Sequence, residues 1–312
     1  MSKLIQHLVI ASGLGEGDVR AILETAPSRY KTYTIPKRNG GVRIISQPAK
    51  EVKYLQRIFM EEILARAPIH SAATAYRKGL SIWDNANAHA DSGAILKFDF
   101  KNFFPSIVAS DWEIYCSRYR FLQDKEDVYW SARLLFCRKT YGSVLRLAIG
   151  APSSPMLSNV LMAEFDTLVT DAVAKDRVTY TRYADDLTFS AKRAGNLVDV
   201  GRILRRIVNE LKSPRLKINE EKTVLATKKY RRVVTGLVLS DDGSVSLGHD
   251  RKRKIRAAMH HFVSGKLNPE DTSHLLGMIA FVNAIEPDFI TRLAAKYGHD
   301  AIEKLKGPVQ SN

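Results

Sequence analysis

The segment VTYTRYADDLTFSA, residues 178–191, carries the clearest structural pattern in this chain of 312 residues. Two runs rich in aromatic and β-branched residues, 178–183 and 187–191, flank Ala184-Asp185-Asp186. Such runs separated by a few turn-forming residues are typical of a tight β-hairpin. Because successive strand side chains point to opposite faces, two adjacent acids can converge on one place only at a turn. The sequence therefore predicts a hairpin with Asp185 and Asp186 at its tip.

A second acid lies near the end of another predicted strand. Residues 94–100, AILKFDF, form a short apolar run that contains Asp99. Burial of an ionised carboxylate costs several kcal/mol unless a cation or hydrogen-bond donors compensate it. Asp99 could instead cap the next turn, and an Asp-Asp turn could simply be solvated. Three carboxylates from two strands are nevertheless a usual way to hold two Mg²⁺ ions, which suits in-line phosphoryl transfer.

Composition agrees with a partner that is a polyanion. The chain has 48 Lys and Arg against 33 Asp and Glu, a net charge of +15, and 45% hydrophobic residues. It can therefore bury a core, and its excess of positive charge favours nucleic acid, although an anionic membrane surface or solubility alone would also permit it. Cys116 and Cys137 have no CxxC or clustered His partners, which argues against a disulfide scaffold or a zinc site. No run approaches the roughly 20 apolar residues of a membrane span, so we expect a cytoplasmic protein without a membrane partner.

The remaining pattern predicts a mixture of helices and strands in one continuous α+β architecture without repeats. Hairpins are expected at 33–45 around Asn39-Gly40-Gly41 and at 233–247 around Asp241-Asp242-Gly243. Helices are expected at 4–14, 51–67, 110–138, 156–174 and 202–211, and through the last 65 or so residues. Pro155 suits the first turn of its helix.

Several motifs now resemble those of reverse transcriptases. FDFKNFFPS at 98–106 and YADD at 183–186 resemble the two catalytic palm motifs of that family. They are joined in order by GGVRII at 40–45, GAPSSP at 150–155, LSN at 157–159 and LKINEEKT at 216–223. NANAH at 85–89 and VTG at 234–236 resemble elements of bacterial retron reverse transcriptases. A retron enzyme is thus the better match, and group II intron enzymes are a weaker one for want of a maturase or endonuclease extension.

The resemblance implies an α+β right-hand polymerase with fingers, palm and thumb. The fingers would comprise residues 1–92 with a return at about 110–145. The palm, on an RRM-like antiparallel sheet, would comprise 93–109 and 146–240. A helical, RNA-binding thumb would follow at 241–312.

The function implied is that of an RNA-directed DNA polymerase of a retron. Such an enzyme synthesises a short single-stranded DNA (msDNA) from deoxynucleoside triphosphates on a cognate structured noncoding msr-msd RNA, primed from a guanosine 2′-hydroxyl. Two Mg²⁺ ions would act per active site, and Mn²⁺ can replace them. An effector protein encoded nearby and a role in defence against phage are also implied. The alternatives are a non-catalytic RNA-binding subunit that retains the palm, and a metal nuclease.

Roles follow residue by residue from the same resemblance. Asp99, Asp185 and Asp186 would be catalytic and bind the metal ions. Phe104 would be the steric gate that excludes ribonucleotides, or else a core residue beside Phe103. Substrate contacts would also come from Arg43, which matches a position that contacts the triphosphate, and from Lys222, which could instead be solvated. Ile149 departs from the family, because a glutamine that lies against the incoming nucleotide is usual there.

RNA binding is expected from two kinds of residue. The retron-like motifs contribute Asn85, His89, Val234, Thr235 and Gly236, although His89 could merely pack in the interior. The basic run contributes Arg251, Lys252, Arg253 and Lys254, which could lie along a nucleic-acid groove or form a solvated helix face.

Overall fold

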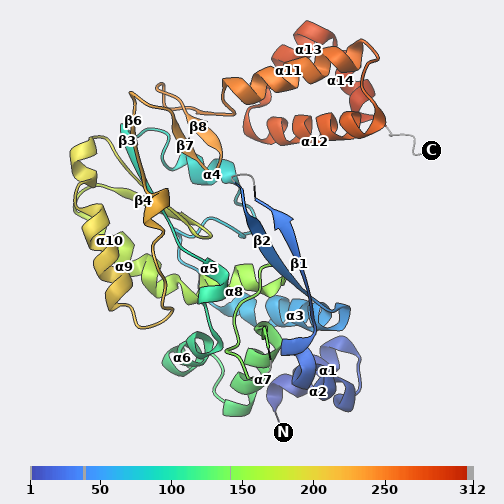
Figure 1. Ribbon diagram of the computed structural model, residues 1–312, viewed down its shortest axis with the longest axis vertical. Coiled ribbons are helices and arrows are strands. Elements are labelled where there is room, and N and C mark those ends of the chain that lie inside the picture. The colour runs from blue at the N-terminus through green and yellow to red at the C-terminus, as the bar shows by residue number, and fades with distance from the viewer. Residues whose placement is uncertain (1, 38–39, 141, 308–312) are drawn as a thin grey trace.

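The structure, a computed structural model, describes residues 2–37, 40–140 and 142–307 (Figure 1). A four-stranded antiparallel sheet lies at its centre, in the order β4, β5, β3, β6. The strand bounds are Thr179–Tyr183, Asp186–Ala191, Ala94–Asp99 and Val224–Thr227, respectively. The predicted strand at 94–100 and the predicted hairpin at 178–191 are both confirmed. Tyr183 pairs with Asp186, so the turn is formed by Ala184 and Asp185, and Asp186 begins a strand instead of lying at the tip.

The two faces of this sheet have different environments. Phe98 and Leu187 belong to the larger hydrophobic core, together with side chains of α9 (Ala163–Ala174) and α10 (Val200–Glu210). These helices lie side by side at the sheet (Figure 1). Because neighbouring strand residues point to opposite faces, Asp99 and Asp186 face away from that core.

The N-terminal part of the chain adds a hairpin and several helices. The predicted hairpin is present as β1 (Tyr30–Pro36) and β2 (Val42–Pro48), and Asn39 of its predicted turn lies outside the described residues. The helices of this part and of the following segment are α1 Lys3–Ser12, α2 Glu16–Thr25, α3 Lys50–Glu62, α4 Ile82–Asn87, α5 Phe103–Ser106, α6 Ala109–Tyr119, α7 Lys125–Leu135 and α8 Ser153–Leu161. Short 3-10 helices span Ala26–Ser28, Leu64–Arg66, Ala194–Leu197 and Glu220–Lys222.

Four predicted helices are shorter or divided, and the one expected at 51–67 divides at Ile63 into α3 and a 3-10 helix. The expected N-terminal helix ends at Gly13, whose φ of 70° caps α1, and α2 follows it. The expected helix at 110–138 is interrupted after Arg120, which has a φ of 52°. The segment 156–174 divides at Met162 into α8 and α9. Apolar periodicity continues through each break, so it could not reveal them.

A second hydrophobic core joins the C-terminal helices to the edge of the central sheet. It is formed by α4, a small three-stranded sheet and the helices α11 His249–Val263, α12 Pro269–Ile285, α13 Pro287–Tyr297 and α14 His299–Lys306. Ile95 of β3 and Ala226 of β6 also belong to it. The helical prediction for the last 65 or so residues is confirmed over 249–306, and residues 308–312 lie outside the described part of the chain.

The predicted hairpin around Asp241-Asp242-Gly243 is confirmed, and one further strand before it makes this stretch a three-stranded meander. Its strands are β7 Arg232–Val234, β8 Leu237–Leu239 and β9 Val245–Ser246. The extra turn consists of Thr235 and Gly236, with φ values of 48° and 81°. Two consecutive left-handed residues are the geometry of a tight hairpin turn, which the Val-Thr-Gly triplet conceals because threonine seldom adopts it. Among the described residues, no helix is both long and apolar enough to cross a bilayer.

Candidate active site

The structure brings the three predicted acids together at one end of the central sheet. Asp99 and Asp186 are paired across β3 and β5 on the face opposite the main core. Asp185 precedes Asp186 in the turn, and its carbonyl oxygen accepts a hydrogen bond of 3.1 Å from the backbone N–H of Phe100. Ala184, with a φ of 57°, makes this turn tight.

Burial and repulsion from neighbouring carboxylates disfavour the ionised forms of Asp185 and Asp186. Burial, followed by the charges of Asp186 and Asp99, raises the pKa of Asp185 to about 6. The pKa of Asp186 is also raised, mainly by burial, while the nearby Lys97 ammonium opposes the shift. A positive charge nearby would therefore stabilise the ionised carboxylates of Asp185 and Asp186.

Lys222 supplies one positive charge. Its Nζ donates to both carboxylate oxygens of Asp99 at 2.9 Å, and Asn219 Nδ2 lies 3.3 Å from Asp99 Oδ1. Burial lowers the pKa of Lys222, but the hydrogen bond to Asp99 and the surrounding acids outweigh it and raise the pKa overall.

In the described part of the chain, no three His, Cys, Asp or Glu side chains are grouped closely enough to hold a metal ion. The acidic oxygen donors nevertheless fit a hard divalent cation in their chemistry.

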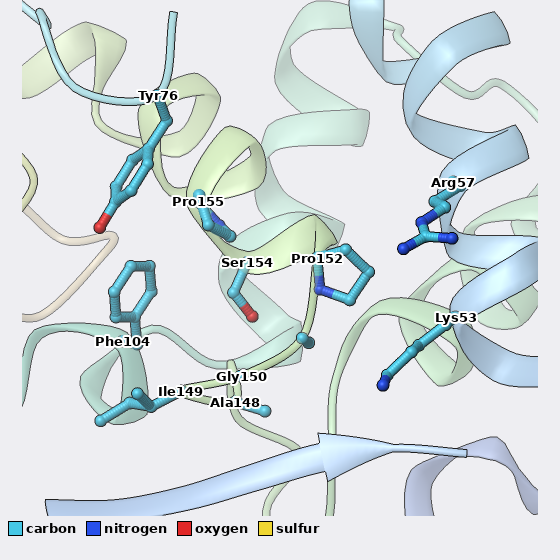
Figure 2. Close-up of a pocket in the computed structure, with 11 residues that line it drawn as sticks. Lys53, Arg57, Tyr76, Phe104, Ala148, Ile149, Gly150, Pro152, Ser154 and Pro155 are labelled. Carbon is cyan, nitrogen blue, oxygen red and sulfur yellow. The ribbon is translucent and has the colours of Figure 1, made fainter. Parts of the chain in front are cut away.

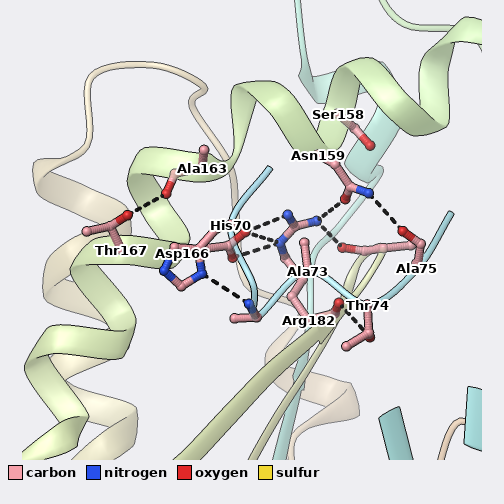
Figure 3. A network of polar contacts seen from close by, with 12 residues as sticks. His70, Ala73, Thr74, Ala75, Ser158, Asn159, Ala163, Asp166, Thr167 and Arg182 are labelled. Carbon is pink, nitrogen blue, oxygen red and sulfur yellow. Dashed lines mark hydrogen bonds and ion pairs between the residues drawn. The ribbon is translucent and has the colours of Figure 1, made fainter. Parts of the chain in front are cut away.

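Arg182 and Asp166 form a buried ion pair that the sequence analysis did not predict (Figure 3). The side chains of Arg182 and Asp166 are both 0% exposed, with contacts of 2.8 Å from Nε to Oδ1 and 2.6 Å from Nη2 to Oδ2. Arg182 Nη1 also donates to the carbonyl oxygen of Ala184 at 3.3 Å and to Asn159 Oδ1 at 3.1 Å. The Tyr180 hydroxyl donates to Asp166. An arginine within a strand otherwise made of core residues was the available sequence signal.

A pocket of about 360 Å³ lies beside the acids (Figure 2). Tyr76 and Phe104 line one side, and the basic side chains Lys53 and Arg57 of α3 line the other. Further lining comes from Ala148, Ile149, Gly150, Ala151, Pro152, Ser154 and Pro155. Phe104 therefore lines the pocket and also packs on Phe103, with ring centroids 5.3 Å apart. Sequence analysis missed Tyr76, Lys53 and Arg57, because none stands in a recognisable motif.

The β1–β2 hairpin is fixed against the loop that contains Ile149. The backbone N–H of Ser46 donates to the carbonyl oxygen of Ile149 at 2.7 Å. Gly150, with a φ of 118°, follows, and a Cβ there would lie 2.9 Å from Ile45 Cγ2. Only glycine permits this close approach. Arg43 of β2 is exposed, and its charge reaches Tyr76 of the pocket, whose pKa it lowers against the larger effect of burial.

Of the retron-like motif residues, Asn85, His89 and Val234 lie inside the molecule, whereas Thr235 is half-buried and Gly236 is exposed. Asn85 and His89 are each 1% exposed. The two ring nitrogens of His89 hydrogen-bond Ser190 and Thr181 at 2.7 Å, and burial lowers its pKa to about 4, with a smaller contribution from Lys97. The packing alternative for His89 is therefore what the structure has, because a buried neutral ring held on both sides is closed to RNA.

The VTG motif is buried only in part. Val234 is fully buried, and Thr235 Oγ1 donates to the carbonyl oxygen of Ile82 at 3.0 Å. Gly236 completes the tight turn. Both motifs thus meet at α4, which joins the central sheet to the small meander.

The basic run at the start of α11 points in two directions. The side chain of Arg253 is 81% exposed, and Lys254 is also exposed. Lys252 instead forms a 2.6 Å ion pair with Glu286 and is 16% exposed. Arg251 lies over the ring of Phe281 at 5.4 Å. Sequence patterning could not distinguish the outward charges from Lys252, whose partner lies 34 residues away.

Comparison with known proteins gives a consistent family. Residues 35–278 match the family model described as "Reverse transcriptase (RNA-dependent DNA polymerase)". The chain is 38% identical to the retron Ec83 reverse transcriptase of Escherichia coli, over 93% of this chain and 94% of that one. It is 36% identical to the retron Ec73 reverse transcriptase of the same organism, over 87% and 88%. A solved structure, apo telomerase from Candida tropicalis, aligns with a TM-score of 0.47 and 11% identity over 88% of this chain and 61% of that one.

Proposed function

The chain belongs to the retron reverse transcriptases, and we propose that this RNA-directed DNA polymerase uses Asp99, Asp185 and Asp186 to bind two Mg²⁺ ions and to copy a structured noncoding RNA into a short single-stranded DNA. Its fold is that of a right-hand polymerase. The observation that carries the proposed site is the register of β3 and β5, which sets Asp99 directly opposite Asp186. We assign fingers to 1–92 with 110–145, the palm to 93–109 and 146–240, and the thumb to 241–312.

Reverse transcriptases as a family use divalent metal ions, and the acids of this chain have suitable oxygen donors. Bound ions would lower the pKa of the attacking hydroxyl and stabilise the leaving pyrophosphate, with Mn²⁺ able to replace Mg²⁺. Asp185 and Asp186 bring carboxylates whose raised pKa values favour a neutralising cation. Phe104 would lie under the sugar, and Arg43 would contact the triphosphate through its planar guanidinium.

The partners we propose are deoxynucleoside triphosphates, a cognate msr-msd RNA and its msDNA product, begun at a guanosine 2′-hydroxyl. RNA and DNA partners follow from the family, whereas the particular RNA is inferred from the similarity of this chain to retron enzymes. We further propose a cytoplasmic complex with an effector protein encoded nearby that acts against phage. Exposed Arg253 and Lys254 support an RNA surface on α11.

The direct test is extension of a DNA primer annealed to a generic RNA template by the purified protein with Mg²⁺ and deoxynucleotides. Extension that depends on Asp185 and Asp186 is the expected result. Because a retron enzyme can require its own primer, the same assay is run with RNA transcribed from the flanking locus. Failure with both templates would overturn the proposed catalysis and favour an RNA-holding subunit.

Lys222 should weaken metal binding while no nucleotide is bound, because its ammonium occupies both oxygens of Asp99. Lys222→Gln is expected to raise the affinity for Mn²⁺ and to raise the KM for deoxynucleotides, each by about tenfold, since a charge-assisted contact is worth about 1.5–3 kcal/mol. Electron paramagnetic resonance of free Mn²⁺ measures the first effect without catalysis. The control is Lys217→Gln, at an exposed position. Unchanged Mn²⁺ affinity would contradict this role.

The exposed charges of α11 should contribute to RNA binding through phosphates. Arg253→Gln combined with Lys254→Gln is expected to weaken RNA binding and to reduce the slope of log K against log salt by about one to two, since each phosphate contact contributes about 0.7–0.9. Lys252→Gln is the matched control, because Lys252 is paired with Glu286. It should lower thermal stability and leave the slope unchanged. An unaltered slope in the double variant would mean that these charges only face solvent.

A further inference from the structure

Tyr76 has a backbone conformation that is unusual for a bulky residue. Its φ is 59°, in the left-handed region that is costly for residues other than glycine, asparagine and aspartate. Such a conformation is strained and persists only where the surroundings enforce it. Two anchors do so here. Asn159 Nδ2 donates to the carbonyl oxygen of Ala75 at 2.8 Å, and Arg77 Nη1 donates to that of Ala73 at 3.3 Å.

The first anchor is part of the buried network below the acids (Figure 3). Arg182 Nη1 donates both to Asn159 Oδ1 and to the carbonyl oxygen of Ala184. Ala184 is itself left-handed, with a φ of 57°. One guanidinium therefore fixes the acidic turn directly and reaches Tyr76 through the Asn159 amide. The fully buried Asp166 carboxylate holds that guanidinium in place.

The side chain of Tyr76 lies beside the proposed steric gate, Phe104, and beside Tyr183 of the acidic hairpin. Its ring centroid is 6.4 Å from the ring of Phe104 and 6.4 Å from that of Tyr183. Burial raises the pKa of its hydroxyl, and the charge of Asp185 adds to this, whereas the charge of Arg43 opposes it. The hydroxyl is therefore near enough to both charges to respond to them. Tyr76 is still 49% exposed.

The hydroxyl of Tyr76 is available to a ligand. No described residue hydrogen-bonds with it. The neighbouring lining of the pocket at Ala148, Ile149 and Ala151 carries apolar side chains, which cannot donate a hydrogen bond. The cations Lys53 and Arg57 lie on the opposite side (Figure 2). Tyr76 thus provides a side-chain donor beside Phe104.

We propose that Tyr76 contacts the incoming deoxynucleotide, its hydroxyl donating to an oxygen of the sugar or phosphate, and that the Arg182–Asp166–Asn159 network positions it. This inference rests on the proposed function, since it places the nucleotide over Phe104 and the acids. It adds to that function a specificity-determining residue and a positioning unit. The network aligns the acidic turn and this donor together, because both depend on one guanidinium.

The test is steady-state primer extension with Tyr76→Phe, which removes the hydroxyl and keeps the ring. The KM for deoxynucleotides is expected to rise about three- to tenfold, as for the loss of one hydrogen bond, with kcat within about twofold of wild type. Adding Ile149→Gln, which introduces an amide donor in the same pocket, should recover at least half of the lost affinity. Tyr230→Phe, at a position 71% exposed, is the control. An unchanged KM in Tyr76→Phe would overturn the inference.

Asn159→Asp tests the positioning unit separately. It keeps an acceptor for Arg182 and replaces the donor to the Ala75 carbonyl with a carboxylate oxygen, which repels that carbonyl and adds a buried negative charge beside Arg182. It should raise KM as Tyr76→Phe does, and the double variant should be no worse than either single variant, because both lose the same contact. Additive effects would overturn the positioning role. Wild-type extension in the same assay separates these failures from failure of the proposed function, and wild-type silence on both RNA templates would overturn both.

Discussion

Replacing Asp185 and Asp186 together with alanine is expected to lower DNA synthesis by at least about a thousandfold, while folding and RNA binding are retained. Metal-ion stabilisation of a phosphoryl-transfer transition state is worth several kcal/mol, and each 1.36 kcal/mol is a factor of ten. Asp185 lies in the two-residue turn and Asp186 follows it, and Arg182 holds the turn through the carbonyl oxygen of Ala184. Primer extension measures synthesis, and RNA binding is measured by titration of labelled RNA.

A matched control exists within the chain. Asp241 and Asp242 form another Asp-Asp turn, at the tip of the β8–β9 hairpin and outside the site. Their replacement with alanine should leave synthesis nearly unchanged. Equal synthesis by the Asp185, Asp186 variant and wild type would remove the assignment of the metal-binding acids.

The Asp185→Ala, Asp186→Ala variant should also change the melting temperature of the protein when no metal ion is bound. The pKa of Asp185 is raised to about 6 in the folded protein, above its ordinary value, so the folded state binds this proton more tightly than the unfolded state. The ionised carboxylate therefore destabilises the fold at pH 7, and its removal should raise the melting temperature in the presence of a chelator. The gain should shrink as the pH falls below 6 and vanish below 3.8, where both states are protonated. A lower melting temperature at pH 7 would contradict this electrostatic picture.

Three of the four strands of the central sheet could be predicted from the sequence because their signals are local, whereas β6 was not predicted. Alternation in 178–191 gave both strands, and the apolar run before Asp99 gave the third. The antiparallel pairing of β3 and β5 places Asp99 opposite Asp186, which agrees with the expected grouping of the three acids. The helical breaks at Arg120 and Met162 could not be found, because apolar residues continue across them and only the backbone conformation changes.

The rest of the site depends on contacts between distant segments. Asn85 and His89 were assigned to RNA by motif, yet their burial depends on how α4 lies on the central sheet. Arg182 finds its partner on α9, and Tyr76 acquires its place only after Asn159 and Ala75 meet. None of these pairings leaves a periodic pattern. The arginine within a strand of core residues is visible in the sequence, but its buried partners and the unusual conformation of Tyr76 are visible only once the chain is folded.

Replacing Phe104 with alanine is expected to reduce the preference for deoxynucleotides over ribonucleotides by about 10- to 100-fold. A ring beneath the sugar leaves little room for a 2′-hydroxyl, and forcing an extra group into a packed site costs about 1–3 kcal/mol. Phe104 lines the pocket and packs against Tyr76 and Phe103. The preference is measured as the ratio of kcat/KM values for the two nucleotide types on one primer and template.

Side chains of different volume at position 104 test whether the change in nucleotide preference is caused by the space beneath the sugar. Phe104→Leu should give an intermediate ratio, because it removes part of the ring's volume while remaining apolar. The neighbouring Phe103 is 4% exposed and stacks on Phe100 in the core. Phe103→Leu should therefore lower the melting temperature and leave the nucleotide ratio unchanged, which separates a gate from general loosening of the site. If the ratio stays constant in Phe104→Ala, the sugar is selected by another residue, and the orientation proposed for the nucleotide over Phe104 and beside Tyr76 must be abandoned.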